Sequence, residues 1–257
     1  MSRIKNAFGK EKAFIAFITG GDPNIETTAR IIRATAAAGV DIIEIGIPFS
    51  DPIAEGPVIQ AASARALAAG CTADKLFDMV KELRKGIQIP LLFMTYANPV
   101  FAYGTDHFMK RCTECGIDGL IIPDTPYEER DEFAGACKQH GIELISMVAP
   151  TSADRTVQIG KVAEGFLYCV SSLGVTGIRT NLTSEIASII STLREVTDIP
   201  CAIGFGISTP EQAKQMAQYA DGIIIGSAIV KIIAEHGENC IEPVADYVSQ
   251  IKKAITQ

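Results

Sequence analysis

The sequence contains no run of lysine or arginine. Its 23 Lys and Arg are outnumbered by 30 Asp and Glu, which gives a formal net charge of -7 over 257 residues. A protein that binds nucleic acid or an anionic membrane needs clustered basic side chains to displace counterions from phosphates. The composition therefore argues against both classes of protein, and an anionic substrate would need a local binding site.

Long hydrophobic runs are also absent. No apolar stretch approaches the ~20 residues that a transmembrane helix requires. The first dozen residues, MSRIKNAFGKEK, place Ile4 and Phe8 one helical turn apart among charges, which does not resemble a signal peptide. The seven cysteines are odd in number and scattered, unlike a secreted disulfide framework. We therefore expect a cytoplasmic protein with reduced thiols.

A regular series of short apolar segments is the main feature that the sequence does contain. These eight segments are apolar almost throughout, which is typical of parallel strands covered on both faces. They span residues 13–19, 41–47, 90–95, 118–122, 142–148, 165–170, 201–205 and 221–225. Helical patterns separate them, and several of these end on a glycine suited to a left-handed C-terminal position.

This alternation predicts an α/β fold, a single (β/α)₈ TIM barrel with a short N-terminal helix. Eight strand-helix units in about 250 residues is the usual size of such a barrel. The first strand is followed by TGGDPN, which lacks the GxGxxG of a dinucleotide-binding sheet. With no linker or low-complexity segment, we expect residues 1–257 to form one domain.

Glu44 is the first candidate catalytic residue, because active sites of these barrels lie at the carboxyl ends of the strands. It interrupts the apolar segment DIIEIGI and shares a face with Ile42 and Gly46. A buried, unpaired carboxyl group can have its pKa raised by ~3 to 5 units, which suits proton transfer near neutral pH. The alternative is a core glutamate satisfied by a hydrogen bond.

A second carboxyl group, that of Glu55, follows in the polar loop PFSDPIAEGPVIQ. A loop acid above a strand acid is an arrangement for acid/base chemistry across a small substrate. The alternative is a solvated loop residue. Tyr168, inside the segment FLYCV, is a candidate phenol, with ordinary barrel packing as its alternative.

Glycine-rich segments follow the last strands and indicate a phosphate site. The segments are GVTG, GFGIS and GSAIV, and the second is followed by Thr209 and Pro210, which open a helix. Glycines let backbone N–H groups approach an anion, and a helix N-terminus adds a favourable dipole. The alternative is that these glycines only form tight turns.

Other chemistries find little support in the sequence. None of the eight segments contains a lysine that could form a Schiff base with a carbonyl substrate. The three histidines lie in or at the ends of helical patterns. Cys112 and Cys115 have zinc-like spacing but no second ligand pair, so we expect helical packing rather than a metal site.

Five motifs occur in the order and spacing of the tryptophan synthase α subunit family: EIGIPFSDPIAEGPVIQ, TYANPVF, SSLGVTG, GFGIS and GSAIVKII. The chain resembles this family from about Phe14 to Ile233. The resemblance implies a lyase that cleaves indole-3-glycerol phosphate by a retro-aldol reaction. It also implies no cofactor on this chain and a pyridoxal phosphate-dependent β subunit as partner, in an α₂β₂ complex.

The resemblance also assigns residues. Glu44 matches a catalytic glutamate, and Glu55 stands where the family often has an aspartate that stabilises positive charge at the indole nitrogen. Ser172 stands where some members have arginine. The substrate-binding positions are Phe17, Tyr168, Thr176, Gly177, Gly206, Gly226 and Ser227, and the positions on the β-subunit surface are Asp51, Asn98 and Pro126.

Three alternatives stay open from sequence alone. The chain could be a different phosphate-binding barrel, such as a sugar-phosphate isomerase. It could be an inactive α-like protein that activates a β subunit, or a free-standing producer of indole. Activity measured with and without a partner separates them.

Overall fold

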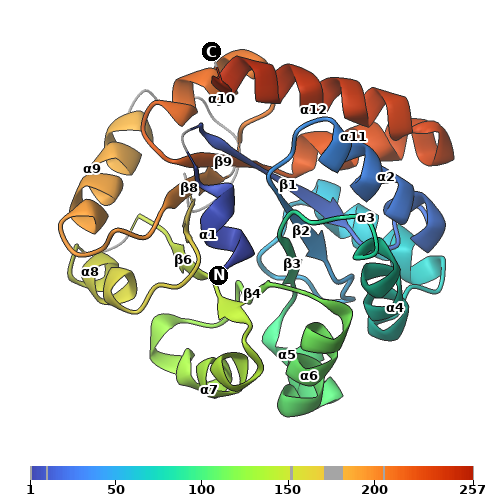
Figure 1. The fold of residues 1–257 in the computed structure, drawn as a ribbon, viewed down its shortest axis with the longest axis horizontal. Helices are drawn as coiled ribbons and strands as arrows, with labels where there is room; N and C mark the ends of the chain where they lie inside the picture. Colours follow the sequence, from blue (N-terminus) through green and yellow to red (C-terminus); the bar gives the residue numbers. More distant parts are fainter. Residues whose placement is uncertain (1, 10, 151–152, 171–181, 205, 257) are drawn as a thin grey trace.

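Parallel strands form a closed ring in the computed structural model, which describes residues 2–9, 11–150, 153–170, 182–204 and 206–256. Figure 1 shows the ring end-on, with helices around its outside. The strands are β1 (Ala13–Thr19), β2 (Ile42–Gly46), β3 (Leu91–Met94), β4 (Gly119–Ile121), β5 (Glu143–Leu144), β6 (Ser146–Val148), β7 (Leu167–Val170), β8 (Cys201–Gly204) and β9 (Gly222–Ile225). The (β/α)₈ barrel expected from the sequence is confirmed.

The strand expected over residues 142–148 closes the ring by changing partners. Its first half, β5, pairs with β4, and its second half, β6, pairs with β7. Between them the Ile145 amide still donates to the Leu120 carbonyl at 2.9 Å. One segment thus supplies both ends of the strand order β5-β4-β3-β2-β1-β9-β8-β7-β6.

Helices alternate with the strands, and they begin and end at residues that can cap the free backbone N–H and C=O groups of a helix terminus. The Asn24 side chain accepts a hydrogen bond from the Thr27 amide at the start of one helix, while Gly116 and Gly141 adopt left-handed conformations at the ends of two others. The helices are α1 (Arg3–Ala7), α2 (Ile25–Ala37), α3 (Pro57–Ala68), α4 (Ala73–Leu83), α5 (Ala97–Tyr103), α6 (Thr105–Cys115), α7 (Asp131–His140), α8 (Ala153–Lys161), α9 (Leu182–Arg194), α10 (Pro210–Ala217), α11 (Ser227–His236) and α12 (Ile241–Thr256), with 3₁₀ turns η1 (Tyr127–Glu129) and η2 (Gly237–Asn239).

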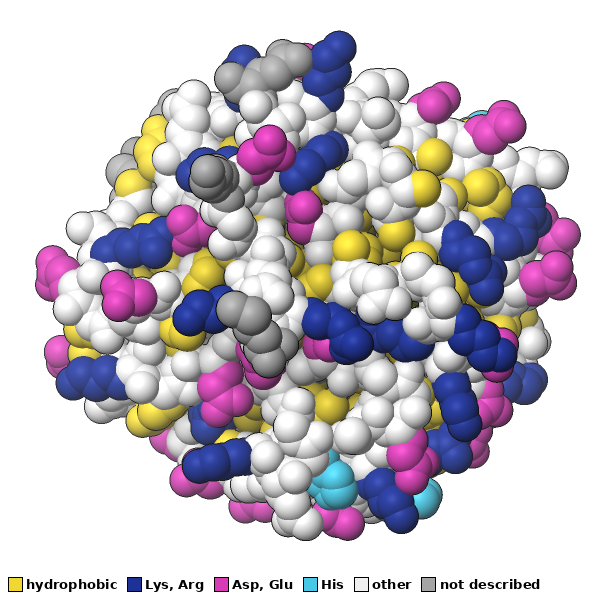
Figure 2. Space-filling model, in the orientation of Figure 1, with side chains coloured by type: hydrophobic (Ala, Val, Ile, Leu, Met, Phe, Trp, Pro, Cys, Tyr) yellow, Lys and Arg dark blue, Asp and Glu magenta, His cyan; other side chains and the backbone are white. Residues whose placement is uncertain are grey.

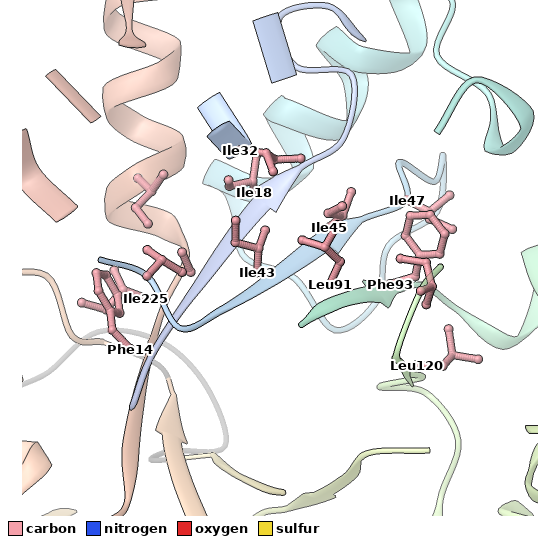
Figure 3. Close-up of a cluster of buried hydrophobic side chains, with 14 of the residues drawn as sticks. Phe14, Ile18, Ile32, Ile43, Ile45, Ile47, Leu91, Phe93, Leu120 and Ile225 are labelled. Carbon is pink, nitrogen blue, oxygen red and sulfur yellow. The ribbon is translucent and has the colours of Figure 1, made fainter. Parts of the chain in front are cut away.

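Two hydrophobic cores follow from the alternation of side chains along the strands. The outer core lies between strands and helices and includes Ile43 and Ile45 (Figure 3). The inner core fills the barrel and includes Ile42 and Phe17. Because successive strand residues point to opposite faces, Glu44 lies on the inner side with Ile42.

The short helix α1 covers the amino ends of the strands, at the centre of the view in Figure 1. Its Ile4 is fully buried in the inner core. The ring of Phe8, just after α1, packs on Phe166 with centroids 5.6 Å apart. This end of the barrel is therefore closed by the chain's own residues.

Charged side chains are interspersed on the face that carries α1, where basic and acidic groups alternate with small apolar areas (Figure 2). Among the described helices, none combines the length and apolar character that membrane crossing requires. All seven cysteines are free and buried, with Cys112 and Cys115 in the outer core as the sequence predicts.

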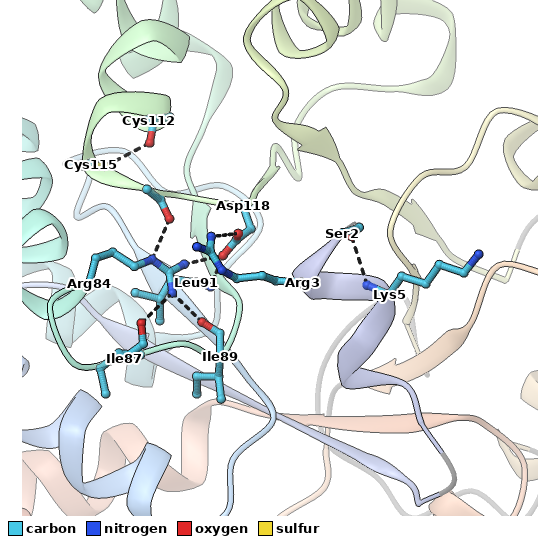
Figure 4. A network of polar contacts seen from close by, with 11 residues as sticks. Ser2, Arg3, Lys5, Arg84, Ile87, Ile89, Leu91, Cys112, Cys115 and Asp118 are labelled. Carbon is cyan, nitrogen blue, oxygen red and sulfur yellow. Dashed lines mark hydrogen bonds and ion pairs between the residues drawn. The ribbon is translucent and has the colours of Figure 1, made fainter.

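A network of polar contacts fixes the amino end of β3 (Figure 4). Arg84 donates to the carbonyl oxygens of Gly116 at 2.7 Å and Ile89 at 2.6 Å, and also pairs with Asp118. Asp118 in turn accepts from the Leu91 amide at 2.9 Å. A second cation, Arg3 of α1, pairs with the same carboxylate at 2.8 Å. The side chains of Arg84 and Asp118 are each only 11% exposed.

We expect Asp118→Ala to lower the free energy of unfolding by about 3 kcal/mol, because it leaves the poorly solvated Arg84 charge without its partner. Urea unfolding measures this change. The control is Glu128→Ala, which removes an exposed ion pair with Arg155 and should leave the midpoint nearly unchanged. Equal losses in the two variants would contradict a special role for the Asp118 network.

Candidate active site

Glu44 lies in the middle of β2, in register with Phe17 of β1 and Leu92 of β3. Its side chain is fully buried, and neither carboxyl oxygen has a hydrogen-bond partner among the described residues. Burial without compensation raises its pKa to about 8. The alternative of a core glutamate satisfied by hydrogen bonds therefore does not hold within the described part of the chain.

Phe17 covers the same level of the barrel, and two glycines make room for it. A Cβ atom on Gly46 would lie 2.6 Å from the Phe17 ring, and one on Gly226 would lie 3.1 Å from the Phe17 Cβ. Real side chains do not tolerate the first distance. Glycine at these strand ends thus lets an aromatic ring lie beside the Glu44 carboxyl group.

Tyr168 on β7 also belongs to the inner core and is nearly fully buried. Burial raises the pKa of its phenol well above the usual value, and the negative charge of an ionised Glu44 raises this pKa further. Gly204 on the neighbouring strand leaves space for the phenol, because a Cβ there would lie 2.7 Å from its oxygen. Tyr168 is therefore a neutral group at the Glu44 site.

Glu55 lies in the loop between β2 and α3 and is not fully solvated. Its Oε2 atom is buried without a hydrogen-bond partner among the described residues, and burial raises the pKa of its carboxyl group to about 7. The side chain of Gln60 donates to the Glu55 carbonyl oxygen at 2.8 Å, which fixes the backbone at this point. The alternative of a freely solvated loop acid is wrong in this structure.

The glycine-rich ends of β8 and β9 lie on neighbouring strands. Gly206 adopts a φ of +78°, and a Cβ there would meet no described atom within 4 Å. Thr209 caps α10 in a capping box with Gln212, so the Gln212 amide already has an acceptor. In contrast, α11 begins at Ser227 after Gly226, without a side-chain cap. Its first amides are available to an anion.

Two residues assigned to substrate binding by the resemblance, Thr176 and Gly177, lie outside the described residues, as does Ser172. Of the other positions assigned by resemblance, Phe17, Tyr168 and Gly226 adjoin the inner core around Glu44. The structure thus brings together residues from β1, β2, β7 and the start of α11.

The three expected partner-surface residues follow the carboxyl ends of successive strands. Asp51 follows β2, Asn98 lies in the first turn of α5 after β3, and Pro126 follows β4, and all three are exposed. Sequence reasoning missed two apolar side chains in the same segments, Ile53 at 80% and Phe101 at 50% exposure. Contiguous apolar patches mark interaction sites, and these two side chains lie in the segments that carry Asp51 and Asn98.

Sequence reasoning also missed Tyr96, which follows β3 and is nearly fully buried. Its phenolic oxygen accepts a hydrogen bond from the Ala54 amide at 3.1 Å, one residue before Glu55. The motif TYANPVF contained this residue, but no local pattern links it to a loop some forty residues earlier.

Metal-binding arrangements are absent from the described ranges, where no group of three or more His, Cys, Asp and Glu side chains could hold an ion. The three histidines lie on helices, as expected, and His140 and His236 are the last residues of α7 and α11. The Nε2 atom of His140 contacts the Asp106 carboxylate at 2.8 Å.

Comparisons with known proteins agree with this geometry. A profile of the family described as "Tryptophan synthase alpha chain" matches residues 4–256. Curated proteins of that name from Lacticaseibacillus casei and Alkaliphilus metalliredigens are 46% and 49% identical to this chain. The alignment with the first covers 99% of this chain and 96% of the relative, and that with the second covers 94% and 91%.

Solved structures lead to the same result. Tryptophan synthase subunit alpha from Legionella pneumophila superposes with a TM-score of 0.90 at 37% identity, over 99% of this chain and 98% of that one. A chain of Mycobacterium tuberculosis tryptophan synthase gives a TM-score of 0.91 at 30% identity, over 100% and 99%. With a profile match over nearly its whole length and such relatives, the chain belongs to the tryptophan synthase alpha chain family.

Proposed function

We infer that this chain is a lyase of tryptophan biosynthesis that cleaves indole-3-glycerol phosphate to indole and glyceraldehyde 3-phosphate. The observation that carries this function is the fully buried carboxyl group of Glu44, which has no hydrogen-bond partner among the described residues and lies beside the Phe17 ring. In a member of this family, such a group is available to the substrate and is not used to hold the fold together.

The reaction needs one proton to move from an oxygen to a carbon. Indole C3 gains a proton, the hydroxyl group on the adjacent side-chain carbon loses one, and the carbon-carbon bond between them breaks. Its electrons return to the ring, and the oxygen becomes the aldehyde carbonyl. With a pKa of about 8, Glu44 can both donate and accept near neutral pH, so it ends the cycle as it began.

Glu55 assists by stabilising positive charge at the indole nitrogen while C3 is protonated. Burial raises its pKa to about 7, and a nearby N–H that gains positive charge favours the ionised carboxylate. The family often has the shorter aspartate at this position. Glu55 has the same charge as that aspartate when ionised. The hydrogen bonds to its loop fix the backbone from which the longer side chain extends.

The phosphate group is held at the ends of β8 and β9. Gly206, Gly226 and Ser227 supply backbone N–H groups there, and the open N-terminus of α11 adds its dipole. Gly177 completes the phosphate site in this proposal, and Thr176 orders the loop over the substrate. Binding through backbone groups fits a chain with a net charge of -7, since it needs no basic cluster.

The partner is the β subunit of tryptophan synthase, which consumes the indole. Family membership supports such a partner, and we propose an α₂β₂ assembly in the cytoplasm. The docking surface comprises Asp51, Asn98 and Pro126 with the exposed apolar groups of Ile53 and Phe101. We assign no cofactor to this chain, because carboxyl groups supply both proton transfers, and place pyridoxal phosphate on the partner.

None of the three alternative functions is favoured by a particular observation. A sugar-phosphate isomerase would not require an aromatic ring packed between two strand-end glycines. An inactive activator would not require a carboxyl group buried without a partner, which destabilises the fold. The decisive experiment is to incubate the purified chain with indole-3-glycerol phosphate, alone and with a β subunit, and to follow indole.

In that assay we expect Glu44→Gln to lower indole formation by at least ~10²-fold, the loss typical of removing an acid/base group. Folding and binding of a phosphate-containing ligand should remain nearly intact. The matched control is Glu143→Gln, a strand glutamate at the opposite end of the barrel, which should retain turnover. Near-native turnover of Glu44→Gln would remove Glu44 from the mechanism.

The raised pKa of Glu44 also predicts how stability depends on pH. The folded chain keeps this proton up to a pH of about 8, whereas the unfolded chain loses it near the ordinary glutamate value. The folded state therefore binds more protons in this window, and the free energy of unfolding falls as pH rises through it, by about 3 to 5 kcal/mol from this group.

Glu44→Gln should remove this contribution, so the variant should be more stable than the parent above a pH of about 8 and similar to it near a pH of about 4.5. Urea unfolding of both proteins across this range measures the difference, in which other titrating groups cancel. A difference that does not change with pH would contradict the proposed protonation of Glu44.

Gly206 and Gly226, two of the glycines proposed to bind phosphate, should respond differently to substitution. A side chain at Gly206 is strained by the positive φ but meets no described atom, so Gly206→Val should weaken phosphate-containing ligands by about 10-fold or more and leave phosphate-free indole analogues unaffected. At Gly226 a Cβ presses on Phe17, so Gly226→Val should weaken both. Calorimetric titration of each variant with both kinds of ligand measures these affinities. If Gly206→Val weakened both kinds equally, the phosphate would bind elsewhere.

A further inference from the structure

Tyr96 connects two separate parts of the barrel mouth. It is nearly fully buried directly after β3, and the amide of the next residue, Ala97, donates to Asp124 at 3.0 Å. Its ring packs on Phe49 with centroids 5.4 Å apart. The phenol is therefore held by the barrel, while its oxygen reaches the loop that follows β2.

The loop segment it contacts carries Glu55. The Ala54 amide donates to the Tyr96 oxygen at 3.1 Å, and Gln60 donates to the Glu55 carbonyl at 2.8 Å. These two bonds hold the backbone on both sides of Glu55. Since Ala54 itself is exposed, the segment depends on such bonds and has little apolar packing to hold it.

We propose that Tyr96 is a positioning residue for the reaction, which holds the Glu55 carboxyl group over the barrel by accepting the Ala54 N–H. This role rests on the proposed lyase function, and it concerns a residue that touches the loop backbone and not the reacting atoms. The anchor is a neutral phenol directly after the neighbouring strand β3, so it fixes the position of the loop acid without neutralising its charge.

The anchor remains intact over the working pH range. Burial raises the pKa of Tyr96 to about 12, with a further contribution from the charge of Glu55. The phenol consequently stays protonated when Glu55 ionises. A phenol that accepts one hydrogen bond still has its own O–H to donate. The loop that Tyr96 contacts also carries an acceptor without a partner among the described residues, the Glu55 Oε2 atom.

Tyr96→Phe tests the proposal, because it removes the oxygen and keeps the ring that packs on Phe49. We expect kcat for indole formation to fall about 3- to 10-fold, the equivalent of one net hydrogen bond, with KM changed less than about 2-fold. Tyr103→Phe is the matched control, since its hydroxyl binds Asp74 at 2.6 Å on the outside of the barrel, and it should leave both constants unchanged.

A double-mutant cycle distinguishes positioning from a general structural effect. In a Glu55→Ala background, Tyr96→Phe should have almost no further effect on kcat, because the group that it positions is gone. Losses that multiply in the double variant would overturn the proposal. The same holds if Glu55→Ala itself retains full turnover.

A second readout does not depend on activity. Amide hydrogen exchange of the peptide that contains Ala54 should be about 2- to 10-fold faster in Tyr96→Phe than in the parent and in Tyr103→Phe. Unchanged exchange would overturn the proposal. If the parent chain forms no indole, the lyase function fails, and the exchange measurement still decides whether Tyr96 holds the loop.

Discussion

Burying the Glu44 carboxyl group without a compensating hydrogen bond is the constraint on which the rest of the site depends. Burial raises its pKa to about 8, so the carboxyl group is mostly protonated near neutral pH, and the surrounding strands must keep it from reaching solvent. The parallel register of β1, β2 and β3 supplies that rigidity, since Phe17, Glu44 and Leu92 lie side by side. The fold thus makes Glu44 a proton donor near neutral pH, where an exposed glutamate would already be ionised.

The polar groups at the amino end of the barrel hold the fold together, and those toward the carboxyl end form the candidate active site. At the amino end, α1, Arg84 and Asp118 satisfy one another's charges and close the ring. Toward the carboxyl end, both Glu44 carboxyl oxygens and the Glu55 Oε2 atom have no hydrogen-bond partner among the described residues, and α11 begins without a side-chain cap. Unsatisfied polar groups destabilise a folded chain, whereas the charged groups at the amino end have partners.

The local sequence determined the fold and the inner position of Glu44. Strands covered on both faces must be apolar throughout, so the eight segments were visible, and the period of two placed Glu44 with Ile42. It also located the helix ends at Gly116 and Gly141, where only the residue type matters. The resemblance, carried by motifs such as PFSDP, supplied the roles of Glu55 and Tyr168, and Thr176 and Gly177 stay predictions.

Tertiary structure alone decided the environment of these groups. Tyr96 and Gln60 make hydrogen bonds to the backbone at Ala54 and Glu55, and whether Gly226 accepts a side chain depends on Phe17, more than two hundred residues away in sequence. The division of residues 142–148 between two neighbouring strands likewise follows from closing the ring. Periodicity reports which face a residue occupies within its own strand or helix. Desolvation and steric fit arise between segments that only the closed barrel brings together.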